Sequence, residues 1–120
     1  MTKPASILLV EDNPMDVELI IHAFKEARLK NKIHTARNGK EALEFLFGEG
    51  QYADRKQYPL PDMILLDLKM PGIDGHEVLR QIKGVEKLKR LPVIILTSSR
   101  DEGDRAMSYD NGANSYLVKP

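Results

Sequence analysis

Short apolar runs alternate along this 120-residue chain with longer segments in which apolar residues recur with a helical period. Each run is too short for a helix core and predicts a buried strand, whereas each longer segment predicts an amphipathic helix that covers a sheet face. Strands that alternate with helices form a parallel sheet with right-handed crossovers and helices on both faces. The sequence therefore predicts one doubly wound α/β domain. The expected strands are Ser6–Val10, Lys32–Ala36, Ile64–Leu66, Pro92–Leu96 and Ser115–Val118.

Capping residues mark the starts of the expected helices. Asn13 is followed by a proline, which a helix accepts at its first position because that N–H has no intrahelical partner. Asn38 and Asp74 are the expected caps of the next two helices, and Asp16 is expected on the solvent side of the first. The fourth helix, Asp101–Asn111, has few large apolar residues, so we expect it to be among the more mobile elements.

The connection from Gly48 to Pro61 is polar and aromatic. It is long for a helix-to-strand connection, where about 2–6 residues are typical. A connection of this length is either functional or an insertion that the fold tolerates, and the sequence leaves both interpretations open.

The composition excludes several classes of function. Eighteen basic and 18 acidic residues give a net charge of zero, which argues against nucleic acid or an anionic membrane as the main partner. The absence of cysteine excludes disulfides and thiolate metal sites and fits a reducing compartment. No apolar run approaches the roughly 20 residues that a membrane span requires. We therefore expect a soluble, cytoplasmic protein.

Polar side chains follow the predicted strands: Glu11 and Asp12 after the first, Asp67 after the third, Thr97 after the fourth and Lys119 after the last. The carboxyl ends of parallel strands meet at one edge of the sheet, where such folds bind ligands. Three carboxylates brought together there repel one another unless a cation lies among them. Oxygen ligands without histidine or cysteine favour a hard ion, and Mg²⁺ is the usual ion where phosphate is also bound.

The chemistry of each side chain suggests its role. Asp67 is expected to be a nucleophile that attacks phosphorus and forms an acyl phosphate. Asp12 is expected to bind Mg²⁺ directly, Glu11 to bind it directly or through water, and the backbone carbonyl of Lys69 to be a further ligand. Lys119 supplies positive charge to the phosphoryl oxygens.

Thr97 is expected to donate its hydroxyl proton to another phosphoryl oxygen. Such a site lowers the barrier by positioning and charge stabilisation, which is most of what phosphoryl transfer requires.

Four motifs together resemble the receiver domain of two-component response regulators. They cover nearly the whole chain, and all five functional positions are present in order; the motifs are Leu9–Asn13, Leu65–Gly75, Leu96–Ser98 and Tyr116–Pro120. The resemblance implies a five-stranded sheet of flavodoxin-like order 2-1-3-4-5. It also implies that Asp67 accepts a phosphoryl group from a phosphohistidine of a sensor histidine kinase, with Mg²⁺, and that slow hydrolysis resets the signal.

The same resemblance implies a switch. Thr97 moves toward the phosphoryl group, Tyr116 rotates inward behind it, and the bond before Pro120 is cis. The changed surface then contacts a downstream protein. On this interpretation the chain is a phosphoacceptor that assists its own phosphorylation and dephosphorylation, not an enzyme acting on other substrates.

Two further features refine this resemblance, and only the second departs from it. The long Gly48–Pro61 connection and the absence of an output domain resemble single-domain regulators that work with phytochrome-type kinases. A receiver normally ends with a fifth helix packed beside the first, whereas residues 1–120 are expected on this interpretation to be a receiver truncated after its last strand. Whole domains have only about 5–15 kcal/mol of net stability, so such a loss is severe. We therefore expect either a fragment or a chain covered by another, as a homodimer or through exchanged elements.

Three other functions compete with this interpretation. Phosphatases with an aspartyl nucleophile resemble Asp-x-Asp, but Lys69 stands at the second position and cannot protonate a leaving group at neutral pH. A flavin-binding module needs hydrogen-bond donors after its first strand, where Glu11 and Asp12 would repel phosphate. An interaction module with an unused acidic site is disfavoured because every required group is present, and a phosphorylation assay decides it.

Overall fold

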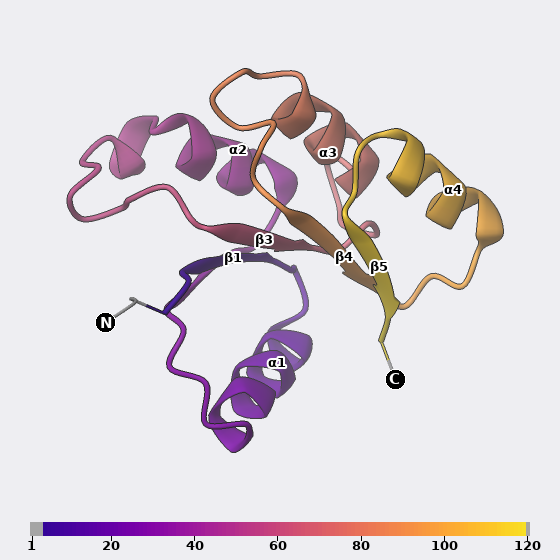
Figure 1. The fold of residues 1–120 in the computed structure, drawn as a ribbon, viewed down its shortest axis with the longest axis horizontal. Helices are drawn as coiled ribbons and strands as arrows, with labels where there is room; N and C mark the ends of the chain where they lie inside the picture. The colour runs from indigo at the N-terminus through magenta and orange to yellow at the C-terminus, as the bar shows by residue number, and fades with distance from the viewer. Residues whose placement is uncertain (1–3, 120) are drawn as a thin grey trace.

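The structure is a computed structural model and describes residues 4–119. Within this range, five parallel strands form one sheet of order β2-β1-β3-β4-β5, which confirms the predicted flavodoxin-like order (Figure 1). The strands are β1 (Ile7–Val10), β2 (Ile33–Ala36), β3 (Met63–Leu66), β4 (Val93–Thr97) and β5 (Ser115–Val118). The helices are α1 (Pro14–Glu26), α2 (Gly39–Phe47), α3 (Gly75–Lys83) and α4 (Glu102–Asp110), with a 3-10 helix η1 (Gly50–Tyr52).

The strands agree with the sequence pattern, with one difference at the site edge. β2 lies at an edge of the sheet, and its side chains are less buried than those of β1. β4 continues to Thr97, which pairs with Val118 of β5. Thr97 is therefore the last residue of its strand, whereas the sequence predicted it as the first residue after the strand. The extension is understandable because β-branched residues such as threonine are favoured in strands.

The predicted N-caps are confirmed by their hydrogen bonds. The side chain of Asn13 accepts from the N–H of Met15, and that of Asn38 accepts from the N–H of Glu41. Asp74 caps α3 as predicted. Asp101, which was predicted inside the fourth helix, lies before it and caps α4 by accepting from two N–H groups of its first turn. These local bonds fix where each helix leaves the site edge of the sheet.

The two faces of the sheet are covered unequally. In Figure 1, α1 lies alone on one face, while α2 and α3 cover the other and α4 follows beside α3 and β5. The larger core cluster lies between the sheet and α2 and α3, and the smaller one contains Ile7, Leu9 and Leu65 with partly buried α1 residues. No residue of α1 is fully buried, and Leu19 is 64% exposed.

The Gly48–Pro61 connection is packed against the domain. Tyr52 is buried and forms an edge-to-face contact with Phe45, with ring centroids 5.1 Å apart. Tyr58 contacts Tyr52 in the same way, also at 5.1 Å, and His34 stacks on Phe45 at 4.4 Å. The segment thus extends the core beyond α2. Between residues 4 and 119, no helix has both the length and the apolar character needed to cross a membrane.

Candidate functional site

Asp67 lies directly after β3 and is held by its backbone. Its N–H donates to the carbonyl of Val10 at 3.1 Å, so the link to β1 continues one residue beyond β3. A Cβ at position 75 would lie 2.5 Å from the Asp67 carbonyl oxygen, which explains the glycine that opens α3. The Asp67 residue is only 6% exposed, but both oxygens of its carboxylate have partners. Oδ1 accepts from the N–H of Lys69 at 3.3 Å, and Oδ2 lies 3.2 Å from Nζ of Lys119.

Three carboxylates converge at this edge. Each of Glu11, Asp12 and Asp67 offers one oxygen, and these oxygens lie within 4.8 Å of one another. Glu11 is 2% exposed, and its burial raises the pKa of its carboxyl, although hydrogen bonds to Lys119 and Asn13 act in the opposite direction. Asp12 is exposed. The donor set consists of carboxylate oxygens only, so it fits a hard divalent cation.

Lys119 neutralises part of this charge. Its Nζ lies 2.5 Å from Glu11 Oε1, 2.8 Å from Asp16 Oδ2 and 3.2 Å from Asp67 Oδ2. Burial lowers the pKa of Lys119, but the hydrogen bonds to Asp16 and Glu11 and the attraction of Asp67 outweigh burial, so that its pKa is raised. The N–H of Lys119 donates to the carbonyl of Thr97 and fixes the end of β5 beside β4.

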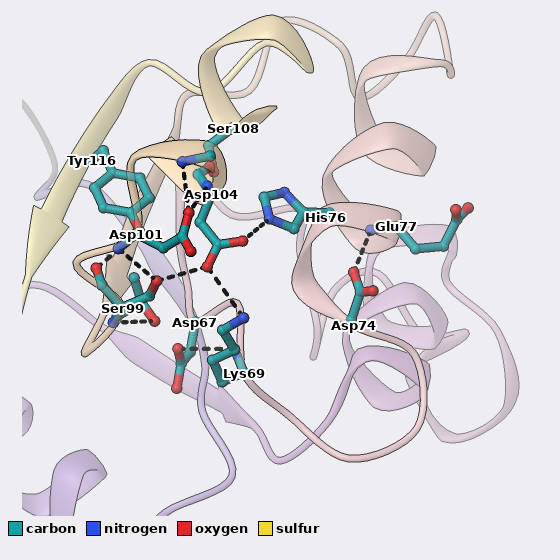
Figure 2. Close-up of polar contacts among 12 residues, drawn as sticks. Asp67, Lys69, Asp74, His76, Glu77, Ser99, Asp101, Asp104, Ser108 and Tyr116 are labelled. Carbon is teal, nitrogen blue, oxygen red and sulfur yellow. Dashed lines mark hydrogen bonds and ion pairs between the residues drawn. The ribbon is translucent and has the colours of Figure 1, made fainter. Parts of the chain in front are cut away.

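Thr97 and Tyr116 both contact Ser99, in the loop after β4. The Thr97 residue is fully buried, and its Oγ1 accepts from the N–H of Ser99 at 3.4 Å. The ring of Tyr116 is buried, and its hydroxyl donates to the carbonyl of Ser99 at 3.0 Å (Figure 2). Among the hydrogen bonds of the described chain, none joins the Thr97 hydroxyl to Asp67. The predicted cis bond before Pro120 involves a residue outside the described range.

Asp104, in the first turn of α4, joins the loops around the site. Figure 2 shows its carboxylate between Ser99, His76 and Lys69. The Ser99 hydroxyl donates to Oδ2 at 2.7 Å, Nε2 of His76 lies 3.1 Å from Oδ1, and Nζ of Lys69 lies 3.2 Å from Oδ2. These contacts lower the pKa of Asp104 to about 2, and the hydrogen bond from Ser99 contributes most to this shift.

Sequence reasoning missed two acidic residues of this region. Asp16 was expected on the solvent side of the first helix, yet its side chain is 31% exposed and pairs with Lys119. Asp104 was expected only as part of a poor helix. One signal was available for Asp104, because it lies three residues after the N-cap Asp101 and so in the helical turn that faces the site edge.

Comparison with known proteins identifies the family. Residues 7–120 match the model of the response regulator receiver domain. The chain is 44% identical over 117 residues to the probable methanogenesis regulatory protein FilR2 of Methanothrix harundinacea, covering 98% of this chain and 73% of that protein. It is also 41% identical over 116 residues to the response regulator Rcp1 of Synechocystis, covering 97% of this chain and 77% of that protein.

Solved structures agree. The phosphorylated cyanobacterial phytochrome response regulator RcpA matches with a TM-score of 0.91 at 42% identity, covering 98% of this chain and 82% of RcpA. The Mn²⁺-bound form of Rcp1 matches with a TM-score of 0.89 at 41% identity, again covering 98% of this chain and 82% of Rcp1. The acidic cluster and the bound Mn²⁺ of that relative together indicate a divalent metal site. The chain therefore belongs to the response regulator receiver domains of two-component systems.

Proposed function

We propose that Asp67 is the phosphoacceptor of this receiver and takes its phosphoryl group from a phosphohistidine of a sensor histidine kinase. The observation that carries the proposal is the surroundings of Asp67. Its buried carboxylate belongs to the acidic cluster and also lies beside the ammonium of Lys119. An Asp67 oxygen forms a bond to phosphorus while the bond from phosphorus to the histidine nitrogen breaks, and the imidazole nitrogen keeps that electron pair.

Mg²⁺ is the proposed metal of the acidic cluster. The carboxylates of Glu11, Asp12 and Asp67 and the backbone carbonyl of Lys69 would hold it, because Mg²⁺ prefers oxygen ligands and is commonly bound together with phosphate. When bound, it supplies charge that offsets the negative charge of the transferring group.

The other proposed roles belong to residues of the chain around Asp67. Lys119 already lies 3.2 Å from an Asp67 oxygen and can move one N–H to a phosphoryl oxygen with little displacement. Thr97 is the switch hydroxyl, since rotation of its side chain would exchange the long bond from Ser99 for one to the phosphoryl group. Tyr116 follows because its hydroxyl is bonded to the same Ser99.

The proposed output is a change in a protein-binding surface. The Ser99 loop leads directly into α4, so a shift of Thr97 and Tyr116 would reach the α4 and β5 surface, where a downstream protein would bind. The similarity to RcpA supports a phytochrome-type sensor as the kinase. The zero net charge gives no support to nucleic acid or membrane as partner. In this role the chain is a phosphoacceptor and does not turn over other substrates.

Intact mass after incubation with acetyl phosphate and Mg²⁺ tests the proposal. We expect the wild type to gain one phosphoryl group, and Asp67→Asn or an excess of EDTA to abolish the gain. Asp110→Asn, an exposed change at the end of α4, is the matched control and should be phosphorylated like the wild type. A gain that persists in Asp67→Asn would refute Asp67 as acceptor. Turnover of a small phosphate ester without a stable adduct would instead favour a phosphatase.

A further inference from the structure

We propose that Asp16 is a positioning residue for Lys119: it holds the ammonium when a metal ion binds the carboxylates that the ammonium otherwise neutralises. The inference rests on the proposed function, because it assigns a role toward the metal of the same site. Asp16 belongs neither to the acidic cluster nor to the four short motifs on which the sequence resemblance rests.

The contacts of Lys119 divide into two kinds. Glu11 and Asp67 belong to the acidic cluster, whereas Asp16 projects from the first turn of α1 outside it. The Asp16 contact, at 2.8 Å, is shorter than that to Asp67, at 3.2 Å. The helix start fixes Asp16, since Asn13 caps α1 with a bond to the N–H of Met15. The third partner of the ammonium is therefore carried by α1, whereas Glu11 and Asp67 follow strands.

Metal binding changes the balance among these partners. Without metal, Lys119 is the cation that permits Glu11 and Asp67 to lie close together. A divalent ion on the same carboxylates repels the ammonium and competes for their oxygens. The Lys119 side chain is only 13% exposed, so it cannot simply turn into water and needs another partner. Asp16 provides a full negative charge at hydrogen-bond distance.

The same argument applies to the phosphorylated state. Lys119 then has one N–H for a phosphoryl oxygen and still needs an anchor that keeps the ammonium at the site. Asp16 meets this requirement without itself binding metal. Without Asp16, the ammonium stays on Glu11 and Asp67 and opposes the metal.

A double-mutant cycle on metal affinity tests the proposal, with MgCl₂ titrated into the unphosphorylated chain by isothermal calorimetry. We expect Asp16→Asn to weaken Mg²⁺ binding about threefold to tenfold, which corresponds to the net contribution of one typical hydrogen bond. In a Lys119→Ala background, Asp16→Asn should have little further effect, because the competing ammonium is absent. Glu18→Gln removes the same charge from an exposed position on α1 and should leave the affinity unchanged.

A second measurement uses rescue. Asp16→Glu keeps the charge and should restore Mg²⁺ affinity, and with it the rate of phosphorylation by acetyl phosphate that Asp16→Asn lowers. Circular dichroism of each variant verifies the fold. If Asp16→Asn weakens Mg²⁺ binding equally in the wild type and in Lys119→Ala, Asp16 acts by its charge alone and the proposal is overturned. An Asp16→Asn variant with unchanged Mg²⁺ affinity would also overturn it. A wild type that binds no Mg²⁺ overturns the proposed metal site itself, so the two failures differ.

Discussion

At the scale of single residues, the side chain of Asp104 connects three segments beside the site. It receives contacts from the β3–α3 loop through Lys69, from α3 through His76 and from the β4–α4 loop through Ser99. Because Nε2 of His76 faces a carboxylate, this nitrogen carries the proton. One carboxylate thus ties α4 to the loop that follows Asp67.

The charge of Asp104 should stabilise the fold in a pH-dependent manner. Its pKa is lowered to about 2 in the folded state, so the stabilisation is complete above the ordinary pKa of about 3.8 and is lost as the pH falls toward 2. We expect Asp104→Asn to cost about 1–3 kcal/mol at pH 7. Urea unfolding at pH 7, 5, 4 and 3 measures the free energy of unfolding of the wild type and of Asp104→Asn. The difference between the two should shrink below pH 4. Asp110→Asn, exposed on the same helix, should change little, and a difference independent of pH would argue against the charge of Asp104.

How far the site could be predicted depends on which element holds each residue. Glu11, Asp12, Asp67 and Lys119 follow strands, and parallel strands bring their carboxyl ends to one edge whatever the details of packing. Residues on helices are different, since their reach depends on how each helix docks and which rotamer its side chain adopts. For this reason the sequence indicated the acidic cluster and missed Asp16 and Asp104.

At the scale of elements, α2 shows how a long connection is ordered. Arg55 donates from Nη2 to the carbonyl of Leu46 at 2.7 Å, and from Nη1 to those of Phe45 at 2.7 Å and Tyr58 at 3.1 Å. Two of these carbonyls lie in the last turn of α2, where no basic residue of the helix is present; the Phe45 carbonyl also accepts from the N–H of Gly48 at 3.2 Å. The caps were predictable because their bonds are local, whereas this contact joins residues nine and ten positions apart.

Replacement of Arg55 should destabilise the domain through the end of α2. Arg55→Lys keeps the charge but cannot reproduce the planar guanidinium fork, so it should lose about 1–2 kcal/mol, and Arg55→Ala should lose more. Urea unfolding at neutral pH measures both. Lys56→Ala changes the exposed neighbour and should remain within about 0.5 kcal/mol of the wild type. A lysine variant as stable as the wild type would show that charge alone stabilises this turn.

At the scale of the whole molecule, the two faces of the sheet differ in how they are covered. The alternation of strands and helices, with right-handed crossovers, predicts helices on both faces but not how many lie on each. In the described residues α1 alone covers one face. A groove there is lined by four apolar residues, Leu19, Ile20, Ala23 and Leu96, together with Asp16, Ser98 and Lys119. The prediction that another chain covers this domain therefore concerns the α1 face.

Two isoleucines, one on each face, test that prediction. Ile82 in α3 is fully buried, so Ile82→Ala should cost about 2–5 kcal/mol through lost burial and a cavity. Ile20 in α1 is only partly buried, and for an uncovered face Ile20→Ala should cost about half as much, because less apolar surface leaves water on folding. Urea unfolding over a range of protein concentrations gives both costs. If Ile20→Ala lowers the free energy of unfolding as much as Ile82→Ala does, and if this loss grows with protein concentration, a second chain covers α1 in solution. A small loss independent of concentration would mean that the domain folds with this face exposed.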